Sequence, residues 1–385
     1  MSTIKVDGIR SNSASSDAIT LADNGTCTAN ITNNLSNRNL IINGAMQVAQ
    51  RGTSFTANGN YTLDRWRVDE AMSAGAATIT QSTTSPDGFS NSLKVDITSA
   101  DTSVAAGEYS QVYQYIEAQN LQQLAYGTSA AKTVTLSFYV RSNKTGNYNV
   151  GILQPDISSR LVSLQYTINS ADTWERKSFT ISGDASGQIN NDNGTGYSIF
   201  WGLAYGTNYT SGSLQSSFTG YSSANFAAGQ SVNLFDSTSN EWYITGVQLE
   251  VGSVATDFEH RYYAQELALC QRYYYQIGST NIGSGDYAIL LGYTFNNGTR
   301  IAAGFIAPQA MRATPSISEI GNGISGYGQG VNEAIASIFG IVGATDTNWI
   351  GFIADGTSSF DWGNDKFPIA LTNTGGGGIA FNAEL

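Results

Sequence analysis

Charge, proline, histidine and cysteine are all scarce in this sequence of 385 residues. Only 12% of the residues are charged, and there are 5 prolines, 2 cysteines and 1 histidine. Any Ser-His-Asp or Cys-His catalytic site would have to use His260, whose place between Glu259 and Arg261 favours packing or a salt-linked hinge. Cys27 and Cys270 lie far apart in the sequence. We therefore expect isolated reduced thiols, folding in a reducing cytoplasm, and no cofactor or metal.

Long apolar runs and positive charge are also missing. No apolar stretch of about 18 residues, the length that spans a bilayer, occurs, and residues 1–5 lack the apolar core of a signal peptide. The formal net charge is -12. Both nucleic-acid binding and attraction to an anionic membrane surface depend on Lys and Arg. The sequence therefore predicts neither a nucleic-acid partner nor membrane insertion.

Glycine and aromatic residues are abundant, and they favour short strands over long helices. The chain has 42 glycines, 21 tyrosines and 16 phenylalanines, and 41% of its residues are hydrophobic. This composition is typical of many strands joined by Gly and Asn turns. Residues 133–140, for example, alternate with Val134, Leu136, Phe138 and Val140 on one face. We predict an all-β fold whose main part is a jelly-roll β-sandwich.

Changes in pattern divide the chain into four predicted parts. Residues 1–37 have strand-like segments at 4–6 and 18–21 but too few apolar residues to fold alone. They should either stay disordered or complete a core by association, and the strand-like pattern favours association. The predicted jelly roll covers residues 38–258. A linking helix is expected over 259–277, and a small C-terminal β domain over 278–385. Further strand-like segments in the jelly roll are residues 147–154, 161–168, 177–181, 197–205 and 241–251.

Within the predicted helix, bulky side chains recur at spacings of 4, 3, 4 and 3 residues. This spacing is that of a short coiled-coil seam. The residues of the seam are Tyr263, Leu267, Cys270, Tyr274 and Ile277. Two interpretations stay open: a single helix packed against the sandwich, or a helix that lines the axis of a trimer.

A series of short motifs runs through the whole chain. The motifs are residues 18–25, 39–47, 50–53, 61–66, 242–252, 255–261, 267–274, 311–315 and 382–385. In this order they resemble bacteriophage tail-fibre or virion-fibre proteins that carry a carbohydrate-binding-module-like jelly roll. The resemblance implies a viral structural protein, a homotrimer, whose N-terminal segment attaches to other virion proteins. It also implies receptor binding and host attachment through surface glycans.

The first and last strands of a jelly roll are neighbours, so their apolar residues must match across the pair. We expect Leu40 and Ile42 to face inward on the first strand. The inward candidates on the last strand are Tyr243, Val247 and Leu249. Trp66 is expected in the core rather than on a ligand platform.

Many modules of the resembled family hold calcium through acidic residues in the first and last strands. The corresponding positions here are Gln47, Thr245 and Gly246, and none is a carboxylate. Calcium prefers charged oxygen ligands, so calcium is not expected there. Residues 190–194 are expected to form tight turns. Residues 321–326 match G-x-G-x-x-G, but the residues after this motif are β-like, so glycine turns are expected instead of a dinucleotide site.

Glycan recognition requires exposed aromatic rings with polar partners beside them. Residues 109–117 would turn Val112 and Ile116 inward and the alternate residues outward. With two loop aromatics added, the candidate glycan-binding residues are Tyr109, Gln111, Tyr113, Tyr115, Glu117, Tyr209 and Tyr221. Phe218 is another loop aromatic that we expect to be exposed. Residues 197–205, by contrast, would place all their alternate large side chains, including Tyr205, in the core. Filling the sandwich or a trimer interface is the alternative for every aromatic candidate.

The expected function is that of a phage tail fibre on the virion exterior, assembled in the host cytoplasm and not an enzyme. One alternative is a head fibre or capsid decoration protein with a purely structural role. Another is a glycan hydrolase, which needs only two suitably spaced carboxylates. The acidic residues near one group of strands are Asp64, Asp69, Glu70, Glu108 and Glu117. Surface charge and turn capping explain most such residues, so hydrolysis is disfavoured.

Overall fold

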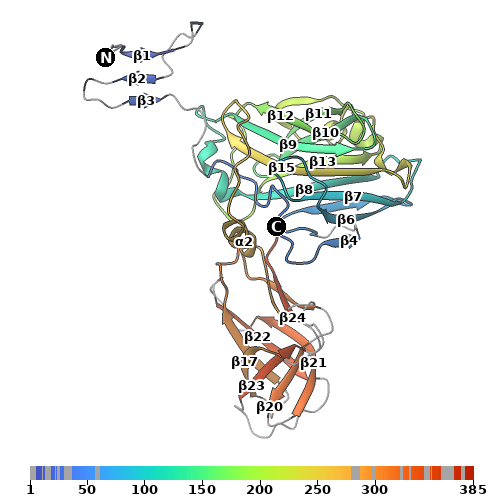
Figure 1. Cartoon of the computed structure of the whole chain (residues 1–385), viewed down its shortest axis with the longest axis vertical. Helices are drawn as coiled ribbons and strands as arrows, with labels where there is room; N and C mark the ends of the chain where they lie inside the picture. Colours follow the sequence, from blue (N-terminus) through green and yellow to red (C-terminus); the bar gives the residue numbers. More distant parts are fainter. Residues whose placement is uncertain are drawn as a thin grey trace.

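The fold is mainly β and has three parts along its length (Figure 1). The computed structural model describes residues 6–10, 12–13, 19–21, 23, 27–29, 37–56, 61–278, 287–295, 300–320, 324–328, 331–341, 347, 349–356, 368–373 and 378–385. A small N-terminal sheet stands beside a large sandwich, and a C-terminal barrel lies on the sandwich's other side. The predicted all-β class is confirmed.

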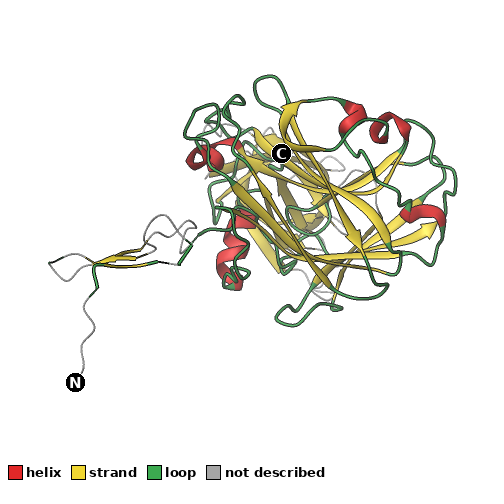
Figure 2. Ribbon diagram, turned by 90° about the horizontal axis from the view of Figure 1, so that it is seen from above, coloured by secondary structure: helices red, strands yellow, loops and turns green. Residues whose placement is uncertain are grey.

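The N-terminal sheet is an antiparallel meander of very short strands. It contains β1 (Gly8–Ile9), β2 (Ile19–Leu21) and β3 (Cys27–Ala29). The strand expected at 18–21 is present as β2, whereas most of the segment 4–6 lies outside the described residues. Apolar side chains of this sheet are exposed, Ile9 by 54%. Figure 2 shows the sheet extended away from the sandwich.

Two antiparallel six-stranded sheets form the sandwich. Sheet I contains, in order, β14 (Gln215–Gly220), β11 (Arg160–Ile168), β10 (Gly146–Gln154), β13 (Thr195–Tyr205), β8 (Tyr109–Glu117) and β5 (Arg67–Ala71). Sheet II contains, in order, β12 (Glu175–Ile181), β9 (Val134–Ser142), β15 (Glu241–Val251), β7 (Ser92–Ser99), β6 (Ala76–Ser82) and β4 (Ser54–Thr56). Short helical turns connect them: η1 (Ala118–Leu124), α1 (Thr207–Thr210), η2 (Ser223–Asn225) and η3 (Leu234–Asp236).

The core lies between these sheets and follows the period of two in the strands. All four inward residues predicted for 133–140 are fully buried in it. Trp66 is buried as predicted, with its ring 5.6 Å from that of Trp201, and Phe138 meets Trp201 edge-on at 5.7 Å. Large aromatic rings thus join the sheets.

The prediction for the first and last strands holds in part. Val247 and Leu249 are fully buried and Leu40 packs against the core, but Ile41 is the fully buried residue of its segment and Ile42 is only partly buried. The segment is not a regular strand: the Leu40 N–H donates to the Leu249 carbonyl at 2.8 Å, but the side chain of Asn39 makes the next contact in place of a backbone group. Because the segment is not a regular strand, its side chains do not follow the period of two that the prediction assumed. Tyr243 lies outside the core cluster, against Arg141 and Lys94.

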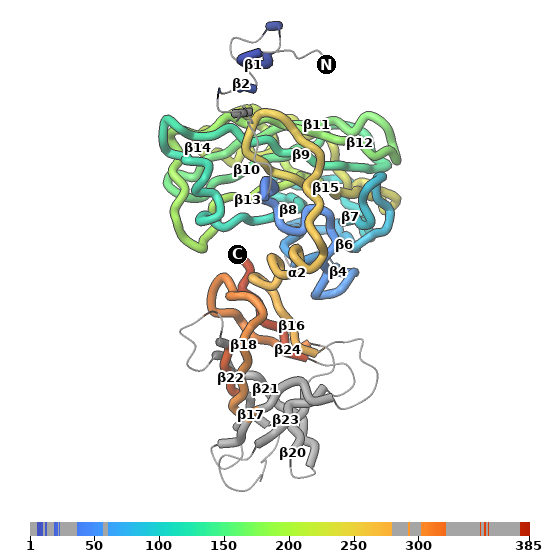
Figure 3. The backbone as a smooth tube through the Cα atoms, turned by 60° about the vertical axis from the view of Figure 1, so that its left-hand side comes forward, coloured from blue at the N-terminus to red at the C-terminus, as the bar shows by residue number. Residues whose placement is uncertain are grey.

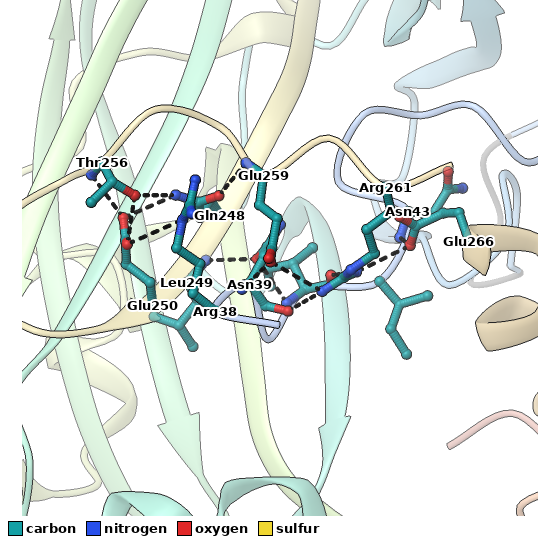
Figure 4. Close-up of polar contacts among 12 residues, drawn as sticks. Arg38, Asn39, Asn43, Gln248, Leu249, Glu250, Thr256, Glu259, Arg261 and Glu266 are labelled. Atoms are coloured by element: carbon teal, nitrogen blue, oxygen red, sulfur yellow. Dashed lines mark hydrogen bonds and ion pairs between the residues drawn. The ribbon is translucent and has the colours of Figure 1, made fainter. Parts of the chain in front are cut away.

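A polar network joins the beginning and the end of the module (Figure 4). The Asn39 side chain accepts a hydrogen bond from the Leu249 N–H at 3.1 Å, and the Asn39 N–H donates to Glu259 at 2.8 Å. Arg261 donates to the Asn39 carbonyl and lies 3.3 Å from the Glu266 carboxylate. Asn39, Leu249, Glu259 and Arg261 belong to the sequence motifs at 39–47, 242–252 and 255–261, so these motifs contact one another where the module closes.

The predicted helix is shorter than expected, and its seam does not form. The helix α2 covers Tyr263–Gln271, and the chain continues as strand β16 (Tyr274–Gly278). Tyr274 and Ile277 therefore lie on a strand, because β16 pairs with β24 (Gly378–Asn382) far along the chain. Tyr263 is 56% exposed, Leu267 is partly buried and Cys270 is buried. Pairing with β24 therefore gives Tyr274–Gly278 a strand conformation, although the spacing of bulky residues up to Ile277 is that of a helix.

The C-terminal part combines a closed barrel (Figure 1) with a small sheet, in which β16 and β24 lie side by side (Figure 3). The barrel order is β17 (Tyr287–Phe295), β18 (Arg300–Ile306), β22 (Trp349–Gly356), β21 (Val331–Ile341), β20 (Ile324–Gly328) and β23 (Pro368–Asn373). β24 lies between β16 and β19 (Ser316–Ile320) in the small sheet. Part of the glycine motif at 321–326 lies outside the described residues. Among the helices that the structure describes, none is long and apolar enough to cross a bilayer.

Candidate functional site

The outer face of sheet I carries two adjoining hollows over β8 and β13. The first, here called the tyrosine hollow, has a volume of about 180 Å³, and the second hollow has about 360 Å³. Gln111 and Phe226 line both, so the two form one groove. Concave sites lined by aromatic rings and a few polar groups are the usual form of small-ligand sites.

The tyrosine hollow is built from β8, the end of β13 and the loops beside them. Its lining residues are Tyr109, Gln111, Tyr205, Tyr209, Tyr221 and Phe226. β8 turns Tyr109 and Gln111 outward, because Val112 and Ile116 of the same strand are buried in the core. Four of the predicted glycan-binding residues, Tyr109, Gln111, Tyr209 and Tyr221, therefore meet in one place.

Tyr205 was expected in the core and instead faces outward. The register of β13 against β8 shifts between Gly202 and Ala204, which reverses the facing of the residues beyond it. The Tyr205 hydroxyl donates to the Gln111 side-chain oxygen at 2.6 Å. A Cβ atom at Gly202 would lie 2.4 Å from the Tyr205 ring, so the glycine leaves room for this ring. A glycine inside a strand pattern was the available signal for such a bulge.

Phe226 was not identified from the sequence. Its ring stacks on Phe200 with centroids 4.0 Å apart and planes at 11°. Phe200 is an outward residue of β13 and belongs to a small apolar cluster with Tyr113 and Leu161. This cluster lies on the outer face of sheet I and supports the floor of the groove. Phe200, on which Phe226 stacks, belongs to β13, whose alternate large residues were expected in the core.

The second hollow continues along β8 toward the C-terminal part of the chain. Its lining residues are Asp69, Gln111, Tyr113, Tyr115, Leu153, Pro155, Thr195, Ser198, Phe226 and Leu385. The rings of Tyr113 and Tyr115 meet edge-on at 5.0 Å, and the Arg67 guanidinium lies 5.4 Å from the Tyr113 ring centre. Tyr113 is only 3% exposed. It therefore supports the groove more than it offers a free ring.

Tyr109, Tyr205 and Tyr221 of the groove have raised pKa values, so their hydroxyl groups are neutral. Burial, followed by the nearby Asp69 carboxylate, raises the pKa of Tyr109, whose hydroxyl donates to Asp69 at 3.2 Å. Burial places the pKa of Tyr205 well above its ordinary value and also raises that of Tyr221. The groove thus combines apolar ring surfaces with hydroxyl, amide and carboxylate groups, the set that contacts sugar hydroxyls and ring faces.

Two of the expectations for aromatic and acidic residues near this surface were wrong. Glu117 is fully buried and forms a two-point ion pair with Arg272 at 2.7 and 2.8 Å. Burial acts against its ionisation, but the hydrogen bonds from Arg272 and Tyr273 prevail and lower its pKa. Glu117 therefore anchors the segment after α2 and does not line the groove. Phe218 is 7% exposed and packs in the core instead of a loop surface.

Carboxylates are sparse in the groove. Among the residues that line the two hollows, Asp69 is the one acidic side chain. Asp64 is buried and accepts hydrogen bonds from Gln50. Glu108 accepts the backbone N–H groups of Ser73 and Ala105. These carboxylates serve the structure of their loops.

Positions that could hold a cation are occupied by protein contacts. The Gln81 amide donates to the carbonyls of Met46 at 2.7 Å and Gln47 at 3.2 Å. Within 190–194, the Gly194 N–H donates to Asp192, and Asn193 donates to the Arg312 carbonyl. The described residues contain no group of three or more His, Cys, Asp or Glu side chains placed to hold a metal ion.

A third hollow, of about 450 Å³, lies on the opposite face, over sheet II. Its lining residues are Ser85, Pro86, Asp87, Tyr139 and Trp174. The Arg176 guanidinium lies 6.0 Å from the Tyr139 ring centre, and the Trp174 ring packs 6.1 Å from that of Tyr243.

No family model and no curated protein match this sequence. The chain is similar in structure to the enzymatically active domain of tailspike protein 4 of bacteriophage CBA120, with 11% identity and a TM-score of 0.30 over 55% of this chain and 21% of that chain. It is similar to a family 4 carbohydrate-binding module, with 16% identity and a TM-score of 0.29 over 54% of this chain and 97% of that chain. It is also similar to a family 11 carbohydrate-binding module from Clostridium thermocellum, solved with a mixed-linked tetrasaccharide, with 10% identity and a TM-score of 0.27 over 54% of this chain and 98% of that chain.

Proposed function

We propose that this protein is a non-enzymatic structural fibre of a phage virion, on the tail, that binds host surface glycans through the groove on sheet I. The groove carries the glycan part of this proposal. Aromatic rings from β8, β13 and two loops surround a hollow whose polar groups are hydroxyls, one amide and one carboxylate. The order of the sequence motifs, which resembles that of phage fibre proteins, supports the virion part.

The chemistry of the groove favours a neutral glycan. Asp69 is the acidic side chain in the lining, and the Arg67 guanidinium beside it lies against the Tyr113 ring. An anionic sugar placed near Asp69 would be repelled, because like charges at short range disfavour binding. The net charge of -12 adds to this repulsion at longer range.

Binding without hydrolysis is the activity that the groove supports best. A glycosidase of the common kind uses two carboxyl groups on either side of the scissile bond. Asp69 is the one acidic side chain among the lining residues. Incubation with host polysaccharides should therefore release no reducing ends, and release would contradict a purely binding role.

Association into a trimer is the second part of the proposal. The N-terminal sheet leaves Val6 and Ile9 exposed by 46% and 54%, and three very short strands bury little apolar surface on their own. Partner copies or other virion proteins would cover these residues. Light scattering of the purified chain should give the mass of three copies, and a stable monomer would contradict the trimer.

A glycan array followed by host-cell binding tests the glycan part. The expected result is binding to a small set of neutral oligosaccharides and to host cells, with loss of both in Tyr209→Ala. Tyr262→Ala is the matched control, because this tyrosine is 86% exposed and lies outside the groove. Uniform failure of the wild-type chain to bind would favour the alternative, a head fibre or decoration protein with a purely structural role.

A further inference from the structure

The segment 383–385, which comes after the last strand of the C-terminal part, lies against sheet I. Figure 1 shows this end of the chain between the sandwich and the barrel. The Ala383 N–H donates to the Tyr273 carbonyl at 2.8 Å, and the Tyr61 hydroxyl donates to the Leu385 carbonyl at 2.8 Å. Residues more than 300 positions apart in sequence thus meet here.

A buried carboxylate fixes this segment. The Glu384 side chain is 4% exposed and pairs with Arg65 and, at 3.0 Å, with Arg51. Arg65 is itself buried and lies over the Tyr273 ring, 3.5 Å from its centre. The Nη2 atom of Arg65 donates to the Tyr115 carbonyl at 2.6 Å. Because an unpaired buried charge is costly, the arginines and Glu384 hold one another in place.

A third arginine fixes the backbone of the same segment. Arg312 donates to the Ala383 carbonyl at 2.6 Å and to the Glu384 carbonyl at 2.8 Å. It also donates to the Asn193 carbonyl at 2.9 Å, and Asn193 returns a hydrogen bond to the Arg312 carbonyl. Asn193 precedes β13, the strand under the groove. The segment is therefore tied to the groove sheet through its carbonyls as well as through Glu384.

Leu385 is the residue of this segment that reaches the ligand groove. It lines the second hollow together with Tyr115, Leu153 and Phe226. Arg65 binds the Tyr115 carbonyl and the Glu384 carboxylate at once, so one buried side chain positions both walls of this hollow.

We propose that Leu385 is a specificity-determining wall of the glycan groove, supplied by the C-terminal part and positioned by Glu384 through Arg65 and Arg51. The proposal rests on the proposed glycan function and adds that the sandwich by itself has an incomplete site. A sugar ring in the second hollow contacts Leu385 on one side and Tyr115 on the other. Leu385 thereby restricts the size of the unit bound there.

The test measures the affinity of the full-length chain by calorimetry. The probes are chitotetraose, cellotetraose and β-1,4-galactotriose, together with a tetramer of galacturonic acid as the acidic counterpart. The variants are Leu385→Ala and Glu384→Gln, and the matched control is Ile306→Ala, a C-terminal residue 72% exposed and outside the groove. For a probe that the wild type binds, we expect Leu385→Ala to weaken binding about ten-fold, the effect of losing most of an apolar contact.

Glu384→Gln should weaken binding of the same probe by a smaller factor, because it releases the segment without removing Leu385. Ile306→Ala should bind as the wild type does. Equal affinities of the wild type and both groove variants would overturn the inference while leaving the glycan function in place. If the wild type binds none of the probes and no host cells, the proposed glycan function is overturned, and so is the proposed role of Leu385. If Glu384→Gln does not fold, Leu385→Ala still decides the result, with its thermal unfolding as the check on folding.

Discussion

The outer faces of the two sandwich sheets both carry aromatic residues, but the groups that contact the aromatic rings differ between the two faces. On sheet II, Arg141 and Lys94 lie 4.9 and 5.6 Å from the Tyr243 ring centre and share the Glu241 carboxylate. On sheet I, the rings of the tyrosine hollow lie against one another, as Tyr109 and Tyr209 do at 5.6 Å, with Tyr221 45% exposed.

This difference separates structural aromatic residues from those available to a ligand. A cation placed over a ring uses its negative face, and the ion pairs around it fix the side chains in place. Rings that contact each other edge-on keep a face for a partner. We therefore assign glycan binding to sheet I and a structural role to the aromatic residues of sheet II, even though the hollow there is larger than either hollow of the groove taken alone.

The largest expected effect comes from a residue that serves both sheets. Trp201 belongs to β13 of sheet I and packs in the shared core against Trp66 and Phe138. Trp201→Ala should lower the free energy of unfolding by about 3–5 kcal/mol, the usual cost of such a cavity. Chemical denaturation followed by fluorescence measures this. A change in the free energy of unfolding below about 1 kcal/mol would show that the two sheets do not share one core.

A smaller effect distinguishes the two faces directly. Tyr209→Ala should weaken glycan binding about ten-fold, because it removes a ring from the tyrosine hollow. Trp174→Ala, the matched change on sheet II, should leave the affinity unchanged. Titration calorimetry with the best ligand from the array provides both values. The opposite result, loss only with Trp174→Ala, would move the site to sheet II.

The two sheets also differ in how they make stability depend on pH. Burial raises the pKa of Glu70, in sheet I, to about 7 from 4.5. Between these values the folded state binds a proton that the unfolded chain has lost, so stability falls as pH rises. In Glu175, on sheet II, burial is outweighed by the Lys177 ammonium and by hydrogen bonds from Ser170 and Asn169, and its pKa falls to about 2 from 4.5. Its contribution is present above pH 4.5 and is lost as pH falls toward 2.

Thermal unfolding of the wild type, Glu70→Gln and Glu175→Gln across this pH range tests the contrast. Glu70→Gln should remove the decline between about pH 4.5 and 7, and Glu175→Gln should remove part of the decline below 4.5. Each variant serves as the control for the other. Parallel curves in all three proteins would contradict the opposite environments of the two carboxyl groups.

Much of the sandwich could be predicted from the sequence, because strand facing depends on local alternation. The buried residues of β9 and the outward residues Tyr109 and Gln111 of β8 were predictable from a period of two. So was the burial of Trp66. In each case the apolar pattern within one segment was sufficient, since a strand with one face in the core can hardly be placed otherwise.

Only the tertiary structure decided the features that depend on a partner segment. A bulge opposite β8 turned Tyr205 outward, and pairing with β24 made a strand of Tyr274–Gly278 where helical spacing continued. Arg272, from beyond α2, drew Glu117 out of the groove face. Phe226 and Leu385 reached the groove from distant loops and ends. Alternation within a strand is local, whereas ion pairs and strand pairing depend on which distant residues meet, so the sequence alone determined the sandwich and the three-dimensional fold determined the site.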